Sequence, residues 1–452
     1  MPGIDRREIE RLLRPVSPAG DHSLDGLAEV RFARAALSTA IEPGDLEAGR
    51  LVELLGPVAL LRAIVEGVDA ALLLKQLAGS DGDDLSDVQR LEAGGAARPD
   101  GPAPSERTSA PAGGSPTAAR GGRRLAEAFA RWRPRLSLGE SVRALERSAR
   151  IGARLLTPES SSWPEGFASL DDGPPLSLWV RGDPSRLERL DRSIALVGAR
   201  ASSGYGEHVA MESAAGLADR GFAVVSGGAY GIDAAAHRAT LASGGLTVAF
   251  LAGGADRLYP AGNSELLRRI ASDGVLAAEL PPGSAPTRWR FLMRNRLIAA
   301  AASATVVVEA GHRSGSLNTA GHAAQMGRPL GAVPGSILSP SSAGCHRLIR
   351  EYAATCVTTT EEMAELADRM GSGPGRDPDP APQADALESG PQGVEHAVVS
   401  TLARARGVSA DEIAARSSLP FSTVAAVLGR LDLAGRARES AGGWTLIEKK
   451  CL

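Results

Sequence analysis

The sequence predicts an α/β protein with a mostly parallel β-sheet, a helical N-terminal domain and a small C-terminal domain of helices and a hairpin. In the centre of the chain, short apolar runs alternate with helical patterns at intervals of roughly 20–30 residues, the rhythm of βαβ units. Two stretches rich in Gly, Pro, Ser and Ala separate this centre from both ends. These two observations predict the fold class and its division into domains.

The composition of the 452-residue chain restricts the class of protein. A net charge of -3 means that any nucleic-acid site must be a local basic patch. No uncharged apolar run reaches the length of about 18 residues expected of a membrane span, and residues 1–14 do not resemble a signal peptide. Cys345, Cys356 and Cys451 form no CxxC pair. We therefore expect no disulfide framework, metal or cofactor, and a cytoplasmic location.

The N-terminal region is predicted to be helical. Within residues 24–78, apolar residues recur at helical spacing: Leu51, Leu54, Leu55, Leu60, Leu61 and Ile64. Gly56 and Pro57 interrupt this pattern and predict two short helices joined at that point. Residues 79–122 and 371–393 have few large apolar side chains, a composition typical of disordered linkers.

The central domain, residues 123–370, contains the predicted sheet. Its strands are expected at 193–197, 222–225, 246–251, 274–278 and 304–308. Runs this apolar fit strands that are buried on both faces of a parallel sheet. Residues 174–180 are a further strand candidate, which follows a proline turn. Right-handed crossovers would place the loops after the parallel strands along one edge.

Glycine-rich loops follow three of these strands, at 198–206, 226–233 and 252–260. Their exposed backbone amides would suit phosphate oxygens, whereas the alternative for each loop is close packing within the sheet fold. The candidate site residues from the first two loops are Gly198, Arg200, Ser203, Gly227 and Gly228. We expect Gly198, Gly228 and Gly254 to lie on one edge of the sheet, close to Arg294.

Residues 288–296 concentrate positive charge, with four arginines among nine residues and no acid between Glu279 and Glu309. Arginines bind phosphates and aromatic faces stack on unpaired bases; the alternative is a solvated helix face with inward-packed aromatics. The candidates here are Arg288, Arg290, Phe291, Arg294, Asn295 and Arg296. Side chains two positions apart on a helix point in different directions. We therefore expect Arg294 or Arg296 to face the crevice and the other to pair with an acid such as Glu279.

A further anion site is predicted after the strand at 304–308. Ser314, Gly315 and Ser316 stand at the start of a helix, where backbone amides can bind an anion. Ordinary helix N-capping is the alternative for these residues.

The C-terminal region, residues 394–452, has the pattern of a winged helix. A helix at 395–404 precedes a capping box at Ser409 to Glu412. A third helix carries a core stripe and a hairpin at 436–447 follows it, which is the winged-helix plan. The third helix contains Arg430 as its one basic residue, beside Asp432, a composition poorly suited to reading a major groove. We expect this module to contact protein and to be dispensable for DNA affinity.

Several motifs, taken in order, resemble the core of the DprA/Smf family of DNA-processing proteins. They are Val197-Gly198-Ala199-Arg200, Gly231-Ile232-Asp233, Tyr259-Pro260, Phe291 with Arg294-Asn295-Arg296, and Ser314-Gly315-Ser316-Leu317. The resemblance runs through residues 190–350 and is weaker in the flanking modules. It departs at Tyr230, where arginine is common in the family, and at His346, where asparagine is usual.

The resemblance implies an extended Rossmann-like domain at 123–370, a SAM or helix-hairpin-helix type domain at 1–78, and a C-terminal winged-helix domain. It implies a non-enzymatic mediator that binds and protects single-stranded DNA. It also implies a homodimer that promotes loading of the recombinase RecA during natural transformation, the DNA uptake of competent cells.

Two other functions remain open. One is a nucleotide-processing enzyme of the lysine-decarboxylase-like phosphoribohydrolase type, which carries a catalytic glutamate on the helix after its phosphate loop. In this chain no glutamate follows within the helix that starts near Ser314, and Glu309 precedes the loop. The other is a sequence-specific regulator that would use the winged helix, which the composition of the third helix disfavours.

Overall fold

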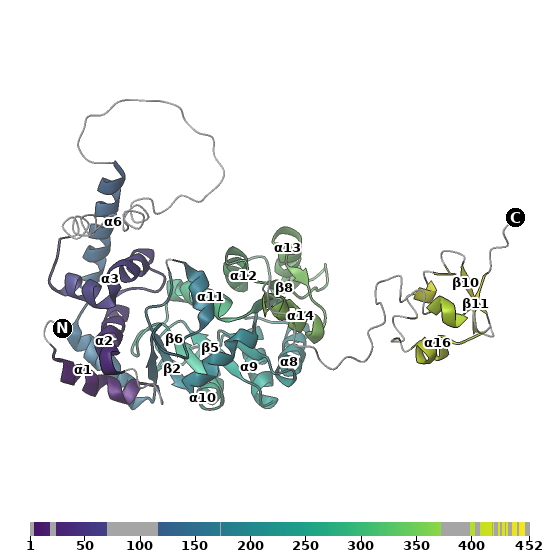
Figure 1. The fold of residues 1–452 in the computed structure, drawn as a ribbon, viewed down its shortest axis with the longest axis horizontal. Helices are drawn as coiled ribbons and strands as arrows, with labels where there is room; N and C mark the ends of the chain where they lie inside the picture. The colour runs from purple at the N-terminus through teal and green to yellow at the C-terminus, as the bar shows by residue number, and fades with distance from the viewer. Residues whose placement is uncertain are drawn as a thin grey trace, which may run out of the picture. The chain divides into compact units, whose positions relative to one another are not determined.

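The computed structural model describes residues 4–18, 24–69, 116–171 and 173–371, and parts of the C-terminal region: 398–402, 407–417, 419, 424, 427–429, 431–432, 436–440 and 443–447. The chain forms two compact units, Met1–Arg376 and Asp377–Leu452 (Figure 1). Among the described residues, no helix has both the length and the apolar character that crossing a membrane requires.

The described part of the first unit contains a nine-stranded sheet in the order β1-β2-β6-β5-β4-β3-β7-β8-β9. The strands are β1 Arg154–Leu156, β2 Leu178–Gly182, β3 Ser193–Gly198, β4 Ala223–Ser226, β5 Thr247–Leu251, β6 Val275–Ala278, β7 Ala304–Glu309, β8 Leu330–Ala332 and β9 Thr355–Cys356. All pairs from β6 to β9 are parallel, and β2 is antiparallel to both β1 and β6. The five predicted parallel strands are confirmed as β3 to β7, and the proline turn leads into β2.

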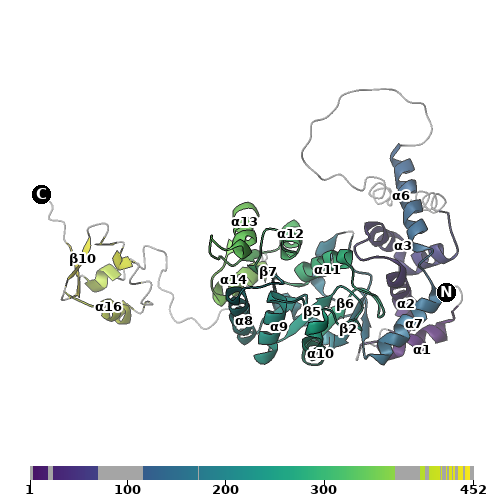
Figure 2. The ribbon, with the colours of Figure 1, turned by 180° about the vertical axis from the view of Figure 1, so that it is seen from behind.

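Helices cover both faces of this sheet (Figures 1 and 2). One face packs against α8, α9, α10 and α14, and the other against α11, α12 and α13. Their bounds are α8 Gly204–Asp219, α9 Ile232–Ala242, α10 Ser264–Asp273, α11 Arg288–Ala301, α12 Ser316–Gln325, α13 Ala343–Glu351 and α14 Thr360–Gly371. Short 3-10 helices are η1 Arg14–Val16, η2 Glu165–Leu170, η3 Pro184–Arg192, η4 Ala261–Asn263 and η5 Pro340–Ser342. Burial on both faces explains why the central strands are continuously apolar.

The N-terminal helices pack against the β1–β2 end of the sheet. They are α1 Arg6–Leu13, α2 Leu24–Ala40, α3 Leu46–Val65, α6 Pro116–Trp132 and α7 Leu138–Arg150. As predicted, α3 is kinked at Gly56, whose φ of 75° suits glycine. Helix α6 begins inside the stretch 79–122 that was expected to be a linker, and residues 70–115 lie outside the described residues.

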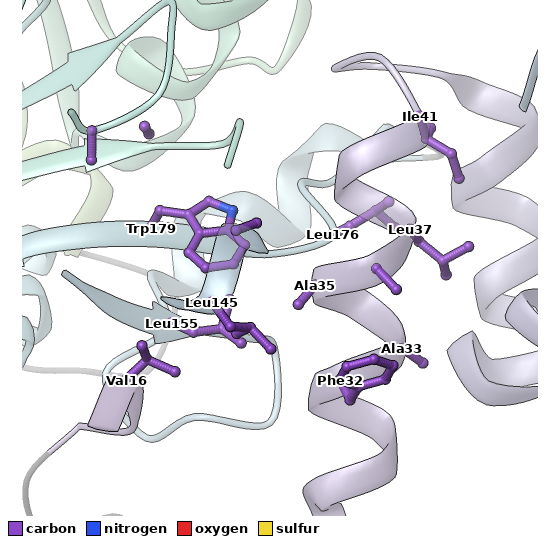
Figure 3. Close-up of a cluster of buried hydrophobic side chains, with 14 of the residues drawn as sticks. Val16, Phe32, Ala33, Ala35, Leu37, Ile41, Leu145, Leu155, Leu176 and Trp179 are labelled. Atoms are coloured by element: carbon purple, nitrogen blue, oxygen red, sulfur yellow. The ribbon is translucent and has the colours of Figure 1, made fainter. Parts of the chain in front are cut away.

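One hydrophobic core joins these helices to the sheet. Phe32, Leu37 and Leu145 belong to the same buried cluster as Leu155 of β1 and Trp179 of β2 (Figure 3). The sequence analysis treats residues 1–78 as a separate domain, whereas buried residues of α1, α2 and α3 belong to the same cluster as those of α7 and of the sheet. These helices are therefore packed against the β1–β2 end of the sheet.

The second unit has the elements that the sequence predicts where they are described. Residues 398–402 are helical, α16 spans Ala410–Ser417, and β10 Ala437–Ser440 pairs antiparallel with β11 Gly443–Leu446. The hydroxyl of Ser409 accepts the Glu412 amide at 3.2 Å, which confirms the predicted cap. The core comprises Val398, Leu402, Val408, Ile413, Val424, Val427, Leu428, Leu431 and Ala437. Parts of the third helix and of the second predicted linker lie outside the described residues.

Candidate nucleic-acid interface

A cavity of about 940 Å³ opens at the carboxyl edge of the sheet. It lies between the loops that follow β3 and β7 and beside helix α11. These two strands are neighbours, but their following helices, α8 and α12, cover opposite faces of the sheet. The loops therefore diverge at a topological switch point, the usual ligand position in sheets of this kind.

Nine of the predicted site residues line this cavity. They are Gly198, Arg200, Arg288, Phe291, Arg294, Asn295, Ser314, Gly315 and Ser316. Tyr259, Arg313, Asn318 and Thr319 also line it, although they were not chosen as site residues. Arg313 could have been chosen from its position directly before Ser314, and Tyr259 from its place in the predicted loop 252–260 and in the Tyr259-Pro260 motif.

An aromatic and cationic wall forms one side of the cavity. The Phe291 ring lies 5.7 Å from the Tyr259 ring, centroid to centroid. The Arg200 guanidinium lies 5.0 Å from the Phe291 ring centroid, and the Arg294 guanidinium lies 5.8 Å from it. Arginine placed over an aromatic face is a favourable arrangement. A planar base and its phosphate would find a stacking surface and a positive charge side by side here.

Arg294 forms part of the floor of the cavity and is only 5% exposed. Its Nη1 donates to the carbonyl oxygens of Gly227 and Phe250, both at 2.6 Å. A side chain at Gly227 would overlap the guanidinium, which explains the glycine at this position. Burial lowers the pKa of Arg294 to about 10, so the residue stays charged at neutral pH. Arg294 thus contacts the carboxyl ends of β4 and β5 at Gly227 and Phe250. Of the three glycines predicted to lie close to Arg294, Gly198 lines the same cavity.

Two backbone amides of the glycine loop after β4 are bonded within the protein. The Asp233 carboxylate accepts the backbone N–H of Gly227 at 3.1 Å and that of Ala229 at 3.3 Å. Burial raises the pKa of Asp233, and the charge of Arg294 opposes this shift. Gly228 has a φ of 67° and packs against Leu267. Neither Gly227 nor Gly228 is among the residues that line the cavity, so close packing is the better description of this loop.

The start of α8 is likewise occupied from within the protein. Glu309 is 2% exposed, and its carboxylate accepts the Ser203 backbone N–H at 2.8 Å and the Ser203 hydroxyl at 2.7 Å. A carboxylate at this position complements the helix dipole. Ser203 is not among the residues that line the cavity of about 940 Å³; Ser203 and Glu309 border a separate cavity. The Glu309 carboxylate is engaged at the helix start.

Arg290 and Arg296 face away from the cavity. Arg296 Nη2 lies 2.6 Å from Glu279 Oε1, and both side chains are nearly buried, which confirms the predicted pairing. Burial raises the pKa of Glu279, and the charge of Arg296 opposes this shift. Arg290 forms two hydrogen bonds to Glu42 of the N-terminal helical region, at 2.9 and 3.0 Å. The sequence identified Arg290 as a site candidate but not its partner.

The start of α12 faces the cavity. The hydroxyls of Ser314 and Ser316 lie 2.8 Å apart, and the space beside Gly315 is open. Among the described residues, the lining contains four arginines, Arg200, Arg288, Arg294 and Arg313, and one carboxylate, that of the buried Asp233. The cavity therefore has the positive character that an anionic ligand requires.

The two departures from the family pattern have structural partners. The Tyr230 hydroxyl accepts the Gly262 backbone N–H at 3.1 Å. The His346 Nε2 lies 2.9 Å from the Gly335 carbonyl oxygen. Neither residue is among those that line the cavity, so these departures leave its lining unchanged.

Comparisons with known proteins place these features in a family. The sequence matches the family described as DNA recombination-mediator protein A over residues 154–368, and the DprA winged helix domain over residues 378–443. It is 48% identical over 314 residues to a DNA processing protein DprA of Mycobacterium tuberculosis, covering 67% of this chain and 79% of that protein.

Two solved structures are also similar. The DprA structure of Streptococcus pneumoniae has a TM-score of 0.47 and 33% identity, and the match covers 54% of this chain and 85% of that chain. A Helicobacter pylori DprA structure, described for its single-stranded DNA binding mode, has a TM-score of 0.43 and 27% identity, with 48% and 96% covered.

Proposed function

Because the chain belongs to the DprA/Smf family of DNA-processing proteins, we propose that its cavity binds single-stranded DNA. The observation that carries this proposal is the Phe291 ring, which adjoins Tyr259 and lies beneath the Arg200 guanidinium. An aromatic ring inside a cavity can stack only on a base that is free of its partner strand. The bases of a duplex are already stacked and paired, so this arrangement favours single strands.

The proposed site separates stacking from charge neutralisation. Phe291 and Tyr259 would stack on bases, while Arg200, Arg288 and Arg313 would contact phosphates. The Ser314 and Ser316 hydroxyls, which line the cavity at the start of α12, would add hydrogen bonds to a phosphate. The backbone N–H groups of Ser314, Ser316 and Leu317 are already bonded within the protein. Phosphate and stacking contacts carry little sequence information, so binding is expected to be nearly independent of sequence.

A salt-dependent titration tests this proposal. Wild-type protein and Arg200→Ala are titrated with single-stranded and duplex oligonucleotides at several salt concentrations. Loss of one phosphate contact should reduce the slope of log affinity against log salt by about 0.7, and by a similar amount for every sequence. Arg143→Ala, which removes an exposed arginine of α7 outside the cavity, is the matched control. Equal affinity of wild type for duplex and single strands would contradict the proposal.

The geometry disfavours the rival enzyme function. A phosphoribohydrolase would need a carboxylate that reaches the bound nucleotide, whereas Glu309 bonds Ser203 and is not among the residues that line the proposed site. We therefore propose a binding function without catalysis. Release of free base from nucleoside monophosphates, abolished by Glu309→Gln, would overturn this part.

The later steps that the family resemblance implies are proposals for this chain. We propose that it self-associates, protects incoming single strands and promotes RecA loading during natural transformation. The test measures RecA filament formation on oligonucleotides coated with single-strand-binding protein. Wild-type protein should accelerate it, and Arg200→Ala should do so only at higher protein concentration. No acceleration by wild type would contradict RecA loading while leaving DNA binding to its own test.

A further inference from the structure

Glu42, which follows α2, contacts the helix that carries the proposed site. Its carboxylate accepts Arg290 Nη2 at 2.9 Å and Arg290 Nε at 3.0 Å. The remaining terminal nitrogen of Arg290, Nη1, donates to the Ala285 carbonyl oxygen at 2.8 Å. Arg135 lies 3.3 Å from the same carboxylate. Arg290 is thus bonded both to the N-terminal helical region and to the loop before α11.

The part of α11 that is held in this way carries the cavity residues. Arg288 and Phe291 stand within three positions of each other in the first turn, on either side of Arg290, and both line the cavity. One turn further on, Gly44 packs against Met293 and Arg296, and Arg296 pairs with Glu279. The face of α11 opposite the cavity is therefore in contact with the segment around Glu42.

We propose that Glu42 is a positioning residue for the binding site, acting through Arg290 on the first turn of α11. This inference rests on the proposed binding of single-stranded DNA to the cavity. It assigns a function to the N-terminal helical region: the region fixes the helix that presents Arg288 and Phe291 to the DNA. A side chain in a binding site must be held to within a fraction of an ångström to keep its contacts.

Whether DNA affinity rises or falls when the Glu42 charge is removed distinguishes a positioning role from a purely electrostatic one. Glu42 is an acid close to a site that binds an anion, and its bond with Arg290 lowers the pKa of Glu42 and keeps it charged. Removing this charge should strengthen DNA binding if Glu42 acts only through its field. It should weaken DNA binding if Glu42 holds α11 in place.

The experiment compares Glu42→Gln, Arg290→Ala and the double variant in the full chain. We expect each single change to weaken single-strand affinity by about fivefold, with the salt dependence unchanged because no phosphate contact is lost. The double variant should bind single-stranded DNA no less tightly than the single variant with the lower affinity, because both changes remove the same interaction. Hydrogen exchange should accelerate at the Arg290 and Phe291 amides and stay unchanged in β4, which a global loss of stability would not produce.

Two controls make the outcomes separable. Glu140→Gln removes an acid that pairs with the exposed Arg143 and should not weaken binding. Arg200→Ala tests the site itself: if it has no effect, the proposed function fails. If Arg200→Ala weakens binding while Glu42→Gln leaves it unchanged or strengthens it, the positioning role is overturned. A decrease in salt dependence for Arg290→Ala would also overturn it, because Arg290 would then contact phosphate directly.

Discussion

The two faces of helix α11 carry the same residue type in different surroundings. On one face, Arg288 and Arg294 border the cavity, where Arg294 lies over the Phe291 ring. On the other face, Arg290 and Arg296 form ion pairs with Glu42 and Glu279. On the cavity face, Arg288 keeps its charge available to a ligand, while Arg294 lines the cavity and also bonds the Gly227 and Phe250 carbonyls. On the opposite face, both arginines are paired with carboxylates of the protein. A cluster of arginines in a sequence therefore does not show how many of them bind a ligand.

The largest expected effect is on the opposite face. Arg296→Met should destabilise the protein by about 3–5 kcal/mol, because it leaves the buried Glu279 without its counter-charge. Urea unfolding measures this change. The double variant Arg296→Met/Glu279→Gln should recover much of the loss, since it leaves no charge behind. If the single and double variants are equally stable, the pair does not act as described and the distinction between the two faces weakens.

The next effect concerns the cavity face. Phe291→Ala should weaken single-strand binding by about 1–3 kcal/mol, the range for loss of one stacking contact. The slope of log affinity against log salt should stay unchanged, because no charge is removed. Phe291→Tyr keeps an aromatic face and should retain most of the affinity. A loss of salt dependence in Phe291→Ala would indicate that the ring serves mainly to orient Arg200.

A buried histidine of α9 should determine part of the protein's sensitivity to acid unfolding. His237 of α9 is buried, its Nδ1 lies 2.7 Å from the Thr247 hydroxyl, and burial lowers the pKa of His237 to about 3. The unfolded chain binds a proton at His237 more readily than the folded protein does. His237 therefore leaves the free energy of unfolding unchanged above about pH 6.5 and lowers it progressively as the pH falls toward 3. One such group changes the free energy of unfolding by at most about 1.4 kcal/mol per pH unit.

Urea unfolding across this pH range tests the contribution. His237→Asn should flatten the dependence of stability on pH, even if it lowers stability at neutral pH. His208→Gln, which replaces an exposed histidine of α8, is the control for the loss of a histidine as such. An unchanged pH dependence in His237→Asn would show that other groups dominate.

The smallest expected effect separates two aromatic residues of the same helix turn. Trp289 is 55% exposed and is not among the residues that line the cavity. Trp289→Ala should therefore change single-strand affinity and stability by no more than about 0.5 kcal/mol. Fluorescence anisotropy with a labelled oligonucleotide measures the affinity beside that of Phe291→Ala. Equal losses in the two variants would extend the proposed site onto the outer surface of α11.

The strands and the position of the cavity could be predicted from the sequence because both depend on local patterns. Continuous apolar runs identify strands buried on both faces, and the carboxyl ends of parallel strands necessarily share an edge. The different directions of Arg294 and Arg296 also follow from local geometry, since helical phase separates side chains two positions apart. Glu279 could be chosen as a partner because it is the nearest acid before a long stretch without acids.

Tertiary structure alone decided which candidates face the cavity. Arg290 meets Glu42 across 248 residues, Ser203 meets Glu309 across 106, and the N-terminal helices join the core of the sheet through Trp179. Loops rich in glycine have the same local pattern whether their amides bind a ligand or, as at Gly227, the carboxylate of Asp233. The fold, the family and the edge of the sheet where the cavity lies therefore followed from local sequence patterns. The partner of each charged side chain depended on which distant segments pack together, because ion pairs and hydrogen bonds form only within a few ångströms.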